Sequence, residues 1–402
     1  MMNPSQLQRR RLLKGLCAAG VLAHVPFAGA MSPSFRSPKM AVFLPSSSRY
    51  PTLSAEYLAG LRLGFAQLGV ESNLIRPIEY GSAPGVAIRR AQTLLTQEPL
   101  DVLTGVICPT AALALEPALL NTGVPLLVND TGANCMARVA DSGLVIRHSL
   151  EYWQSCAAFG HWAATHVGRR AVLALGSLEY GYDFPRAFSD AFTASGGTLV
   201  ATHISGMPQA QEEFSGLASM IQEHQPDFVF ALYSGQQGKR FLDTYHASGL
   251  SDKVLLAGGG FLGTSESFGN RGPELSVASW HSANVSCTRF SAACATTNVP
   301  VTPFSVLGYE SGERIANAWL TSGASEDAFA HLLGAQPGDG PREQRHYQMA
   351  SMESHGAHWI AQAGASPQSL ARVTVNDSFS TSFALQNRLQ PQRGWANPYL
   401  VT

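Results

Sequence analysis

The sequence predicts an α/β fold in which two parallel sheets are each covered by helices on both faces. Short apolar runs of strand length alternate with segments of helical periodicity from Met40 onward. This alternation comes in two series, and a short apolar crossing at residues 143–148 separates them. Residues 31–402, at roughly 100–200 residues per domain, also suggest two domains. With 45% apolar residues, the chain can bury two cores.

The first series reads as strand and helix in turn. In its first helix, apolar residues such as Tyr57, Leu61 and Phe65 recur at helical spacing. We expect strands at 40–44, 73–76, 102–107 and 125–128, and helices at 54–68, 86–97 and 110–121. Repeated units of this kind predict a parallel sheet with helices on both faces.

The second series repeats the pattern and ends in less regular sequence. We expect helices at 151–166, 184–195, 214–224 and 238–248, strands at 170–175, 199–203, 227–232 and 254–257, and a further strand at 276–280. A strong helix follows at 308–320, and a Gly/Pro-rich run at 334–341 breaks the pattern. The last forty residues, rich in Ser, Asn, Gln and Pro, predict an extended surface strap.

The first 30 residues are typical of an export signal. A basic head, Arg9 to Lys14, precedes an uncharged apolar run at 15–25 and the small residues Ala28-Gly29-Ala30. The run is shorter than the about 20 apolar residues that span a bilayer. The order Arg9-Arg10-x-Leu12-Leu13-Lys14 resembles the twin-arginine motif, although an ordinary secretory signal is the alternative. Either route predicts a working protein that begins near Met31, outside the cytoplasm.

The charge balance argues against nucleic acid and anionic membranes as partners. Removing the four basic residues of the export segment from the 27 in the chain leaves 23 against 28 acidic residues, a net charge of −5. Both partners demand basic patches. No second apolar run reaches membrane-spanning length, so we expect no embedded segment. The five remaining cysteines are odd in number, so at least one thiol is free or buried. Cys287–Cys294 and Cys135–Cys156 are candidate disulfides, and the alternative for each is a pair of small buried apolar residues.

Four blocks of sequence carry a family resemblance. They are residues 101–111 (DVLTGVICPTA), 123–133 (GVPLLVNDTGA), 169–183 (RRAVLALGSLEYGYD) and 226–235 (PDFVFALYSG). In this order and spacing, they resemble type I periplasmic binding proteins, specifically the branched-chain amino-acid type (Leu/Ile/Val-binding) substrate-binding subunits of ABC importers. The resemblance implies two doubly wound α/β lobes joined by three crossover segments, with one small ligand between them.

Carried over to this chain, the resemblance places the lobes and crossings. Lobe 1 would hold residues 38–146 and 283–345. Lobe 2 would hold 147–282, together with 346–402 and the C-terminal strap. The crossings would fall near Arg147, Trp280 and Gln344.

In lobe 1, two loops at the carboxyl ends of strands are expected to hold the ligand. Open α/β sheets bind ligands at such ends, and helix N-termini there suit a carboxylate. The first loop is Cys108-Pro109-Thr110, in which Thr110 is a good helix cap, and the second is Thr131-Gly132-Ala133. The resemblance implies that both clamp a carboxylate through backbone N–H and hydroxyl groups. The alternatives are a plain cap for Thr110 and a turn hydroxyl for Thr131.

In lobe 2, the resemblance implies that Tyr180 closes over the ligand, with Tyr233 and Ser234 after a later strand. Gly260 and Phe261 complete the expected site, with Phe261 as an apolar wall.

One departure from the family bears on the ligand. Amino-acid binders of this type place an acidic residue in the loop that here reads Gly258-Gly259-Gly260-Phe261. A buried ammonium without a counter-charge is unfavourable. The loop therefore favours a neutral amide, an aromatic or aliphatic acid or another small carboxylate over an α-amino acid, unless Asp130, Glu179 or Asp183 reaches in.

These observations predict a binding protein rather than an enzyme. The spacing of His346, His355 and His358 does not match a zinc motif, and Gly258-x-Gly260-x-x-Gly263 is a weak match to a dinucleotide fingerprint, so we expect no metal and no cofactor. The predicted function is capture of a small organic ligand (carboxylate, amide or amino-acid-like) by a monomer that delivers it to ABC permease subunits. A ligand-sensing receptor on the same scaffold, signalling to a membrane partner, is the alternative.

Overall fold

The structure is a computed structural model. It describes residues 36–135, 142–206, 214–264, 271–323, 326–335, 340–343, 346–348, 353–364, 366, 369–375, 377–389 and 398–401. The expected export segment at 1–30 lies outside the described residues. Within the part of the chain that is described, no helix combines the length and apolarity that crossing a membrane requires.

The first sheet is parallel throughout and has the order β2-β1-β3-β4-β5. Its strands are β1 (Met40–Pro45), β2 (Ile75–Gly81), β3 (Val102–Val106), β4 (Leu126–Asp130) and β5 (Val145–Ser149). The helices between them are α2 (Leu53–Gln67), α3 (Pro84–Gln97), α4 (Pro109–Ala114) and α5 (Glu116–Thr122). Strands β1, β3, β4 and β5 are wholly buried, as a sheet covered on both faces requires.

The second sheet has seven strands in the order β14-β13-β10-β9-β8-β6-β7. The strands are β6 (Arg170–Leu175), β7 (Thr198–Ile204), β8 (Phe228–Leu232), β9 (Leu255–Gly259), β10 (Leu275–Ala278), β13 (His358–Gln362) and β14 (Ala371–Val373). The helices are α6 (Tyr152–His166), the short η1 (Glu179–Gly181), α7 (Phe184–Ala194), α8 (Leu217–His224), α9 (Gly235–Ala247) and α10 (Phe261–Thr264). Strand β13 pairs antiparallel with both β10 and β14, and the other described pairs of this sheet are parallel. The α/β class with two parallel-sheet lobes is thus confirmed, and we call the lobes built on the two sheets lobe 1 and lobe 2.

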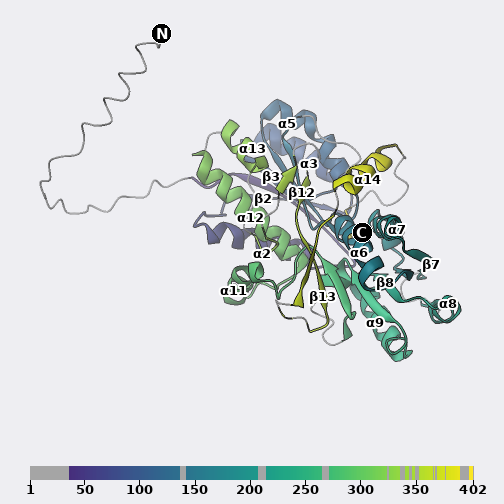
Figure 1. The fold of residues 1–402 in the computed structure, drawn as a ribbon. Coiled ribbons are helices and arrows are strands. Elements are labelled where there is room, and N and C mark those ends of the chain that lie inside the picture. Colours follow the sequence, from purple (N-terminus) through teal and green to yellow (C-terminus); the bar gives the residue numbers. More distant parts are fainter. Residues whose placement is uncertain are drawn as a thin grey trace, which may run out of the picture. The chain divides into compact units, whose positions relative to one another are not determined.

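The remaining elements lie in the second half of the chain. They are η3 (Val285–Cys287), α11 (Thr288–Thr297), α12 (Pro303–Ser322), α13 (Glu326–Ala335), the hairpin β11 (His346–Gln348) and β12 (Glu353–His355), and α14 (Asp377–Leu389). Helix α12 lies beside α2 of lobe 1 (Figure 1). Glycines permit the close approach, since a Cβ at Gly64 or Gly308 would lie within 2.2 Å of the facing helix backbone.

Three sequence predictions need correction. Residues 143–148 are not a crossing between lobes but supply β5, which pairs with β4 at the edge of the first sheet. The single helix expected at 110–121 is divided into α4 and α5, because Pro117 lacks the N–H that a continuous helix needs. The last forty residues are not simply a surface strap, because they include α14 and the buried residues 398–401.

The five cysteines of the described residues, Cys108, Cys135, Cys156, Cys287 and Cys294, are all free and buried. Neither disulfide alternative forms in this structure. Burial raises the pKa of the Cys156 thiol, so the thiol stays neutral and packs as a small apolar side chain in the core.

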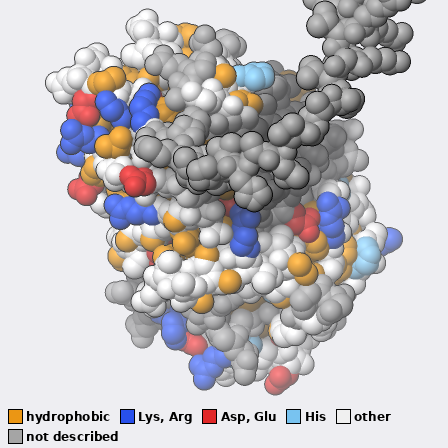
Figure 2. Space-filling model, turned by 90° about the vertical axis from the view of Figure 1, so that its left-hand side faces the viewer, with side chains coloured by type: hydrophobic (Ala, Val, Ile, Leu, Met, Phe, Trp, Pro, Cys, Tyr) orange, Lys and Arg blue, Asp and Glu red, His pale blue; other side chains and the backbone are white. Residues whose placement is uncertain are grey.

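One face of the molecule illustrates the charge balance. On this face, Lys and Arg side chains are interspersed with Asp and Glu among apolar and neutral ones (Figure 2). The basic side chains drawn there do not merge into one field.

Candidate functional site

The two lobes meet where loops leave the carboxyl ends of β4 and β6. The carbonyl oxygen of Ala133, after β4, accepts hydrogen bonds from the backbone N–H groups of Asp183 and Phe184, after β6, at 3.1 Å each. The expected loop residues of both lobes therefore lie along one boundary, as the rule for open α/β sheets anticipates.

In the first loop of lobe 1, the structure places Cys108 rather than Thr110 at the cap of α4. Cys108 is buried, Pro109 is half-buried in the first turn, and Thr110 is exposed. Burial is the main cause that raises the pKa of the Cys108 thiol. The loop thus presents a neutral thiol and backbone groups to its surroundings.

The second loop of lobe 1 is held by a buried ion pair. Arg147 donates from Nε to Asp130 Oδ2 and from Nη2 to Asp130 Oδ1, at 2.9 Å each, so Asp130 is committed to the loop rather than to a ligand. Gly132 adopts a φ of 70°, and a Cβ there would lie 2.7 Å from the Glu151 nitrogen. The Oγ1 atom of Thr131 is buried and makes no hydrogen bond in the structure.

In lobe 2, Glu179 is the acidic group that reaches the boundary. Its side chain is fully buried. Ser234 Oγ donates to Oε1 over 2.6 Å, and Tyr399 Oη donates to the same oxygen over 2.5 Å. Oε2 makes no hydrogen bond in the structure. It packs against Gly176, where an added Cβ would lie only 2.1 Å from it. Burial raises the pKa of Glu179. Asp183, by contrast, accepts from the backbone N–H of Cys135 at 3.0 Å.

The three tyrosines of this region differ in burial. Tyr180 is 53% exposed, whereas Tyr182 is 6% exposed and packs at the boundary. Tyr233 is buried in lobe 2, where its ring stacks on Phe241 at 4.1 Å and its hydroxyl lies 2.7 Å from Ser205 Oγ. Of the expected pair after β8, Ser234 is the residue that contacts Glu179.

Aromatic rings surround Glu179 at the boundary. We define the interlobe aromatic cluster by its chain of ring contacts, at centroid distances between 5.0 and 6.4 Å; its members are Tyr50, Tyr152, Tyr182, Phe184, Phe261, Phe304 and Tyr399. Gly260 adopts a φ of 57°, and a Cβ there would meet the Tyr152 ring at 3.5 Å. The arrangement suits a flat apolar group with a polar end.

A cation from lobe 1 also reaches lobe 2 here. Arg49 follows β1, and its guanidinium donates to Gln237 Oε1 at 3.4 Å and to Ser177 Oγ at 3.3 Å. Its charge acts to lower the pKa of Glu179, against the larger effect of burial. The boundary therefore holds a cation, a buried carboxyl group, a free hydroxyl and aromatic rings.

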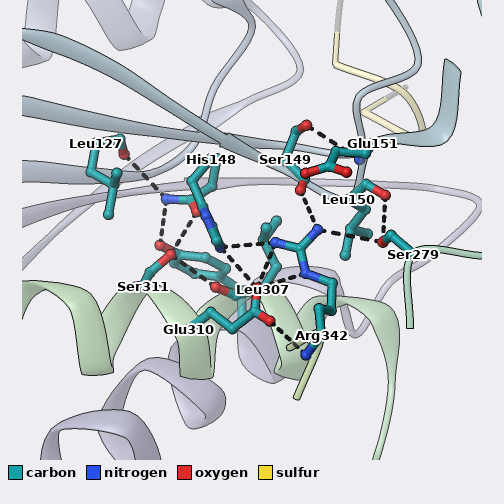
Figure 3. Close-up of polar contacts among 12 residues, drawn as sticks. Leu127, His148, Ser149, Leu150, Glu151, Ser279, Leu307, Glu310, Ser311 and Arg342 are labelled. Atoms are coloured by element: carbon teal, nitrogen blue, oxygen red, sulfur yellow. Dashed lines mark hydrogen bonds and ion pairs between the residues drawn. The ribbon is translucent and has the colours of Figure 1, made fainter. Parts of the chain in front are cut away.

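A second polar cluster joins residues at and after the end of β5 to Ser279, Glu310 and Arg342 (Figure 3). Arg342 donates from Nε to Glu310 Oε2 at 2.7 Å and from Nη1 to the Ser149 carbonyl at 2.5 Å. Ser279 Oγ lies 3.4 Å from the same Nη1 and donates to the Leu150 carbonyl at 2.7 Å. His148 Nε2 lies 3.1 Å from Glu310 Oε2. We call these residues the hinge cluster.

Burial and neighbouring charges determine which groups of the hinge cluster are charged. Burial alone would raise the pKa of Glu310, but Arg342 and His148 outweigh it and hold that pKa well below its usual range. Burial lowers the pKa of His148 to about 4, so the imidazole is neutral at pH 7. Arg342 is charged and 0% exposed. The charged Arg342 therefore pairs with Glu310 and also hydrogen-bonds to Ser149 and Ser279.

Sequence reasoning missed several residues of the interlobe aromatic cluster. Tyr152 and Phe184 each start a helix and read as core positions in the sequence. Arg49 and Tyr50 lie in a loop without a motif, and Tyr399 lies 217 residues beyond Tyr182, the ring that it contacts at 5.0 Å. The acid beside this cluster was anticipated in part. The sequence offered Glu179 as one of three carboxylates that could replace the acidic residue missing after β9.

Two α/β lobes with a polar and aromatic boundary define a bilobed binding protein. The chain belongs to the periplasmic binding protein family, since the family model described as "Periplasmic binding protein" matches residues 37–343. Among the described residues, no group of three or more His, Cys, Asp or Glu is placed to hold a metal ion.

The individual proteins that resemble this chain share less than a third of its residues in the aligned regions. Leu/Ile/Val-binding protein homolog 6 of Brucella melitensis is 29% identical over 166 residues, which is 41% of this chain and 42% of that protein. The match therefore spans about two fifths of this curated relative. An ABC transporter substrate-binding protein from Sphaerobacter thermophilus has a similar fold, with a TM-score of 0.70, 20% identity and coverage of 85% of this chain and 97% of that one. A solute-binding protein from R. palustris in complex with benzoate has a TM-score of 0.67 and 22% identity, over 85% and 98% of the two chains.

Proposed function

We propose that this chain is the solute-binding subunit of an ABC importer in the periplasm. It captures one small organic solute between its lobes and delivers it to the permease. Membership of the periplasmic binding protein family supports the class. The names of the relatives, a Leu/Ile/Val-binding homologue and a benzoate complex, support small carboxylates as the ligand type.

The observation that carries the proposal is a pair of buried polar atoms without hydrogen-bond partners. Thr131 Oγ1 in lobe 1 and Glu179 Oε2 in lobe 2 are buried, and neither makes a hydrogen bond in the structure. A buried polar group left unpaired is unfavourable by about 1–3 kcal/mol, so such groups point to a ligand. Both belong to the two loops that meet through Ala133 and Asp183.

Closure of the two lobes is the proposed mechanism. A solute that touches both lobes stabilises the closed arrangement through contacts that the open one lacks. Arg49 spans the boundary with long hydrogen bonds of 3.3–3.4 Å, which a bound carboxylate can replace. The hinge cluster connects the crossing segments, so the lobes move while these backbones stay linked.

The side chains at the lobe boundary restrict the chemical class of the solute. The rings of the interlobe aromatic cluster suit an aromatic or aliphatic body, and the Thr131 hydroxyl and the Arg49 guanidinium suit a carboxylate. Glu179 supplies the acid that the loop at 258–261 lacks, but burial favours its neutral form and Ser234 already donates to it. A ring-bearing or amide-bearing carboxylate therefore fits better than an α-amino acid.

The proposal is tested with the protein exported and purified from residue 31 onward. Thermal unfolding is measured against panels of aromatic acids, amides and amino acids, because a ligand raises Tm by mass action. We expect stabilisation by at least one ring-bearing acid or amide, confirmed by calorimetry with one site per chain. Stabilisation by Leu, Ile and Val alone would reject the ligand class, and no stabilisation by any solute would reject the function.

A further inference from the structure

A short segment far along the chain, residues 399–401, lies inside the proposed ligand site. Tyr399 is 2% exposed, and Leu400 and Val401 are 0% exposed. In Figure 1, the C-terminus is marked beside α6 and α7, and these helices carry Tyr152 and Phe184.

The Tyr399 ring fills the aromatic part of the site. Its centroid lies 5.0 Å from Tyr182, 5.4 Å from Phe184, 5.9 Å from Phe261 and 6.2 Å from Tyr152. Its hydroxyl donates to Glu179 Oε1. The ring is thus enclosed in lobe 2, with its hydroxyl on the buried carboxyl group of Glu179.

The following residues reach lobe 1. Val401 belongs to the apolar cluster of lobe 1 that also contains Cys108 and Ala111, the expected ligand loop. Leu400 adopts a φ of 75°, an unfavourable conformation for a leucine, and the backbone turns so that Val401 N–H donates to the Pro398 carbonyl at 2.9 Å. Three residues therefore bridge both lobes, as a captured solute does.

We propose that Tyr399, Leu400 and Val401 are a tethered occupant of the ligand site, which an incoming solute displaces. The inference rests on the proposed function, because it concerns the same site. Since the segment is covalently attached, its effective concentration is high. The apparent affinity for every solute is the intrinsic affinity multiplied by the fraction of chains whose site the segment has left. The solute that replaces it presents an aromatic ring with a hydroxyl to Glu179.

Two properties favour a displaceable segment over a fixed part of the core. Eight residues separate Leu389, the end of α14, from Pro398, so the chain is long enough for the tail to leave while α14 stays in place. The Tyr399 ring also covers Glu179 with a single hydrogen bond and leaves Oε2 unpaired, whereas a fixed core contact normally satisfies a buried carboxyl group.

The test supplies the tail in trans. A peptide of residues 395–402 with an N-terminal fluorophore is titrated with the full chain carrying Tyr399→Ala, and anisotropy reports binding. We expect saturable binding to this variant and at least tenfold weaker binding to the unsubstituted chain, whose site is filled. The control Leu385→Ala changes an exposed residue of α14 and should behave as the unsubstituted chain.

Each outcome decides the inference. No peptide binding to the folded Tyr399→Ala chain, or equal binding to both chains, overturns the tethered occupant. With the peptide bound, competition by 4-hydroxybenzoate should be at least tenfold stronger than by benzoate; equal competition overturns the hydroxyl requirement. Peptide binding without competition by any small solute would instead count against the proposed function, so the two failures are distinguishable.

Discussion

Two buried glutamates in this molecule have opposite environments. Glu310 in the hinge cluster contacts Arg342 and His148, and its pKa is lowered. Glu179 at the lobe boundary accepts hydrogen bonds from the hydroxyl groups of Ser234 and Tyr399, keeps Oε2 unpaired, and has a pKa that burial raises. A fully compensated charge serves a fixed structure, whereas an incompletely compensated one is available to a ligand. The difference separates the hinge cluster from the proposed ligand site.

The largest expected effect comes from removing the cation of the hinge cluster. Arg342→Ala leaves Glu310 buried without its main partner, and removing one partner of a buried pair typically destabilises by about 3–5 kcal/mol. Urea unfolding measured by tryptophan fluorescence gives the value. The control Arg271→Ala removes a surface ion pair and should leave stability nearly unchanged, because solvent screens exposed pairs. A similar loss in both variants would remove the distinction between hinge and surface pairs.

Glu179→Gln is expected to separate binding from stability. The amide keeps the shape of the side chain and avoids burying a charge, so the free energy of unfolding at pH 7 should stay unchanged or rise. Affinity for the solute found in the panel should fall about tenfold or more, because a hydrogen bond to a carboxyl group is replaced. Calorimetry measures the affinity, and Glu98→Gln, in an exposed ion pair, is the control. A destabilised Glu179→Gln chain with unchanged affinity would make Glu179 structural.

The pH dependence of stability should have opposite signs at the two glutamates. The lowered pKa of Glu310 means that its stabilisation is present above about 4.5, the ordinary value, and is lost as the pH falls. His148, with a pKa lowered to about 4 from 6.5, loses its contribution in the same direction. The raised pKa of Glu179 gives stability that is present below about 4.5 and is lost as the pH rises.

Unfolding free energies between pH 3 and pH 8 check these signs. The deficit of Glu310→Gln relative to the unsubstituted chain should shrink on acidification. The advantage of Glu179→Gln should instead shrink as the pH falls below the ordinary value for glutamic acid. Parallel curves for the two variants would contradict the assigned environments.

The smallest effect is expected at Ser279. Ser279→Ala removes a buried hydroxyl that donates to the Leu150 carbonyl, which should cost about 1 kcal/mol of stability. Ser276→Ala is the matched control, because its hydroxyl makes a longer bond of 3.4 Å in a half-buried position. Differential scanning calorimetry resolves the two. An equal or larger effect at Ser276 would show that Ser279 adds nothing to the hinge.

Local pattern was sufficient for most elements of the two sheets. Strands such as β1, β3 and β6 were predicted within a residue or two, because a buried parallel strand needs a short continuous apolar run. The strand at 73–76 was misplaced relative to β2, whose outward residues break the apolar run. The start of α12 was missed because its capping box at Thr302 and Ser305 uses a serine in place of the usual Glu or Gln.

For the candidate site, the sequence indicated which loops take part but not which side chains contact one another. Ala133, Ser234 and Phe261 were expected from strand ends, and the structure places all three at the lobe boundary. Tyr180 and Tyr182 are two residues apart, and only the turn of η1 decides which ring faces the boundary. Thr110 was expected as a cap, yet α4 begins one residue earlier with Pro109 in its first turn.

The sequence by itself determined the two α/β series and the family, because apolar periodicity and short motifs are properties of neighbouring residues. Tertiary structure alone decided which buried carboxyl group is compensated and which is not, and that Tyr399 lies on Glu179. Such contacts join residues far apart in the chain, and their energies depend on burial and on partners from several elements. No local pattern encodes them.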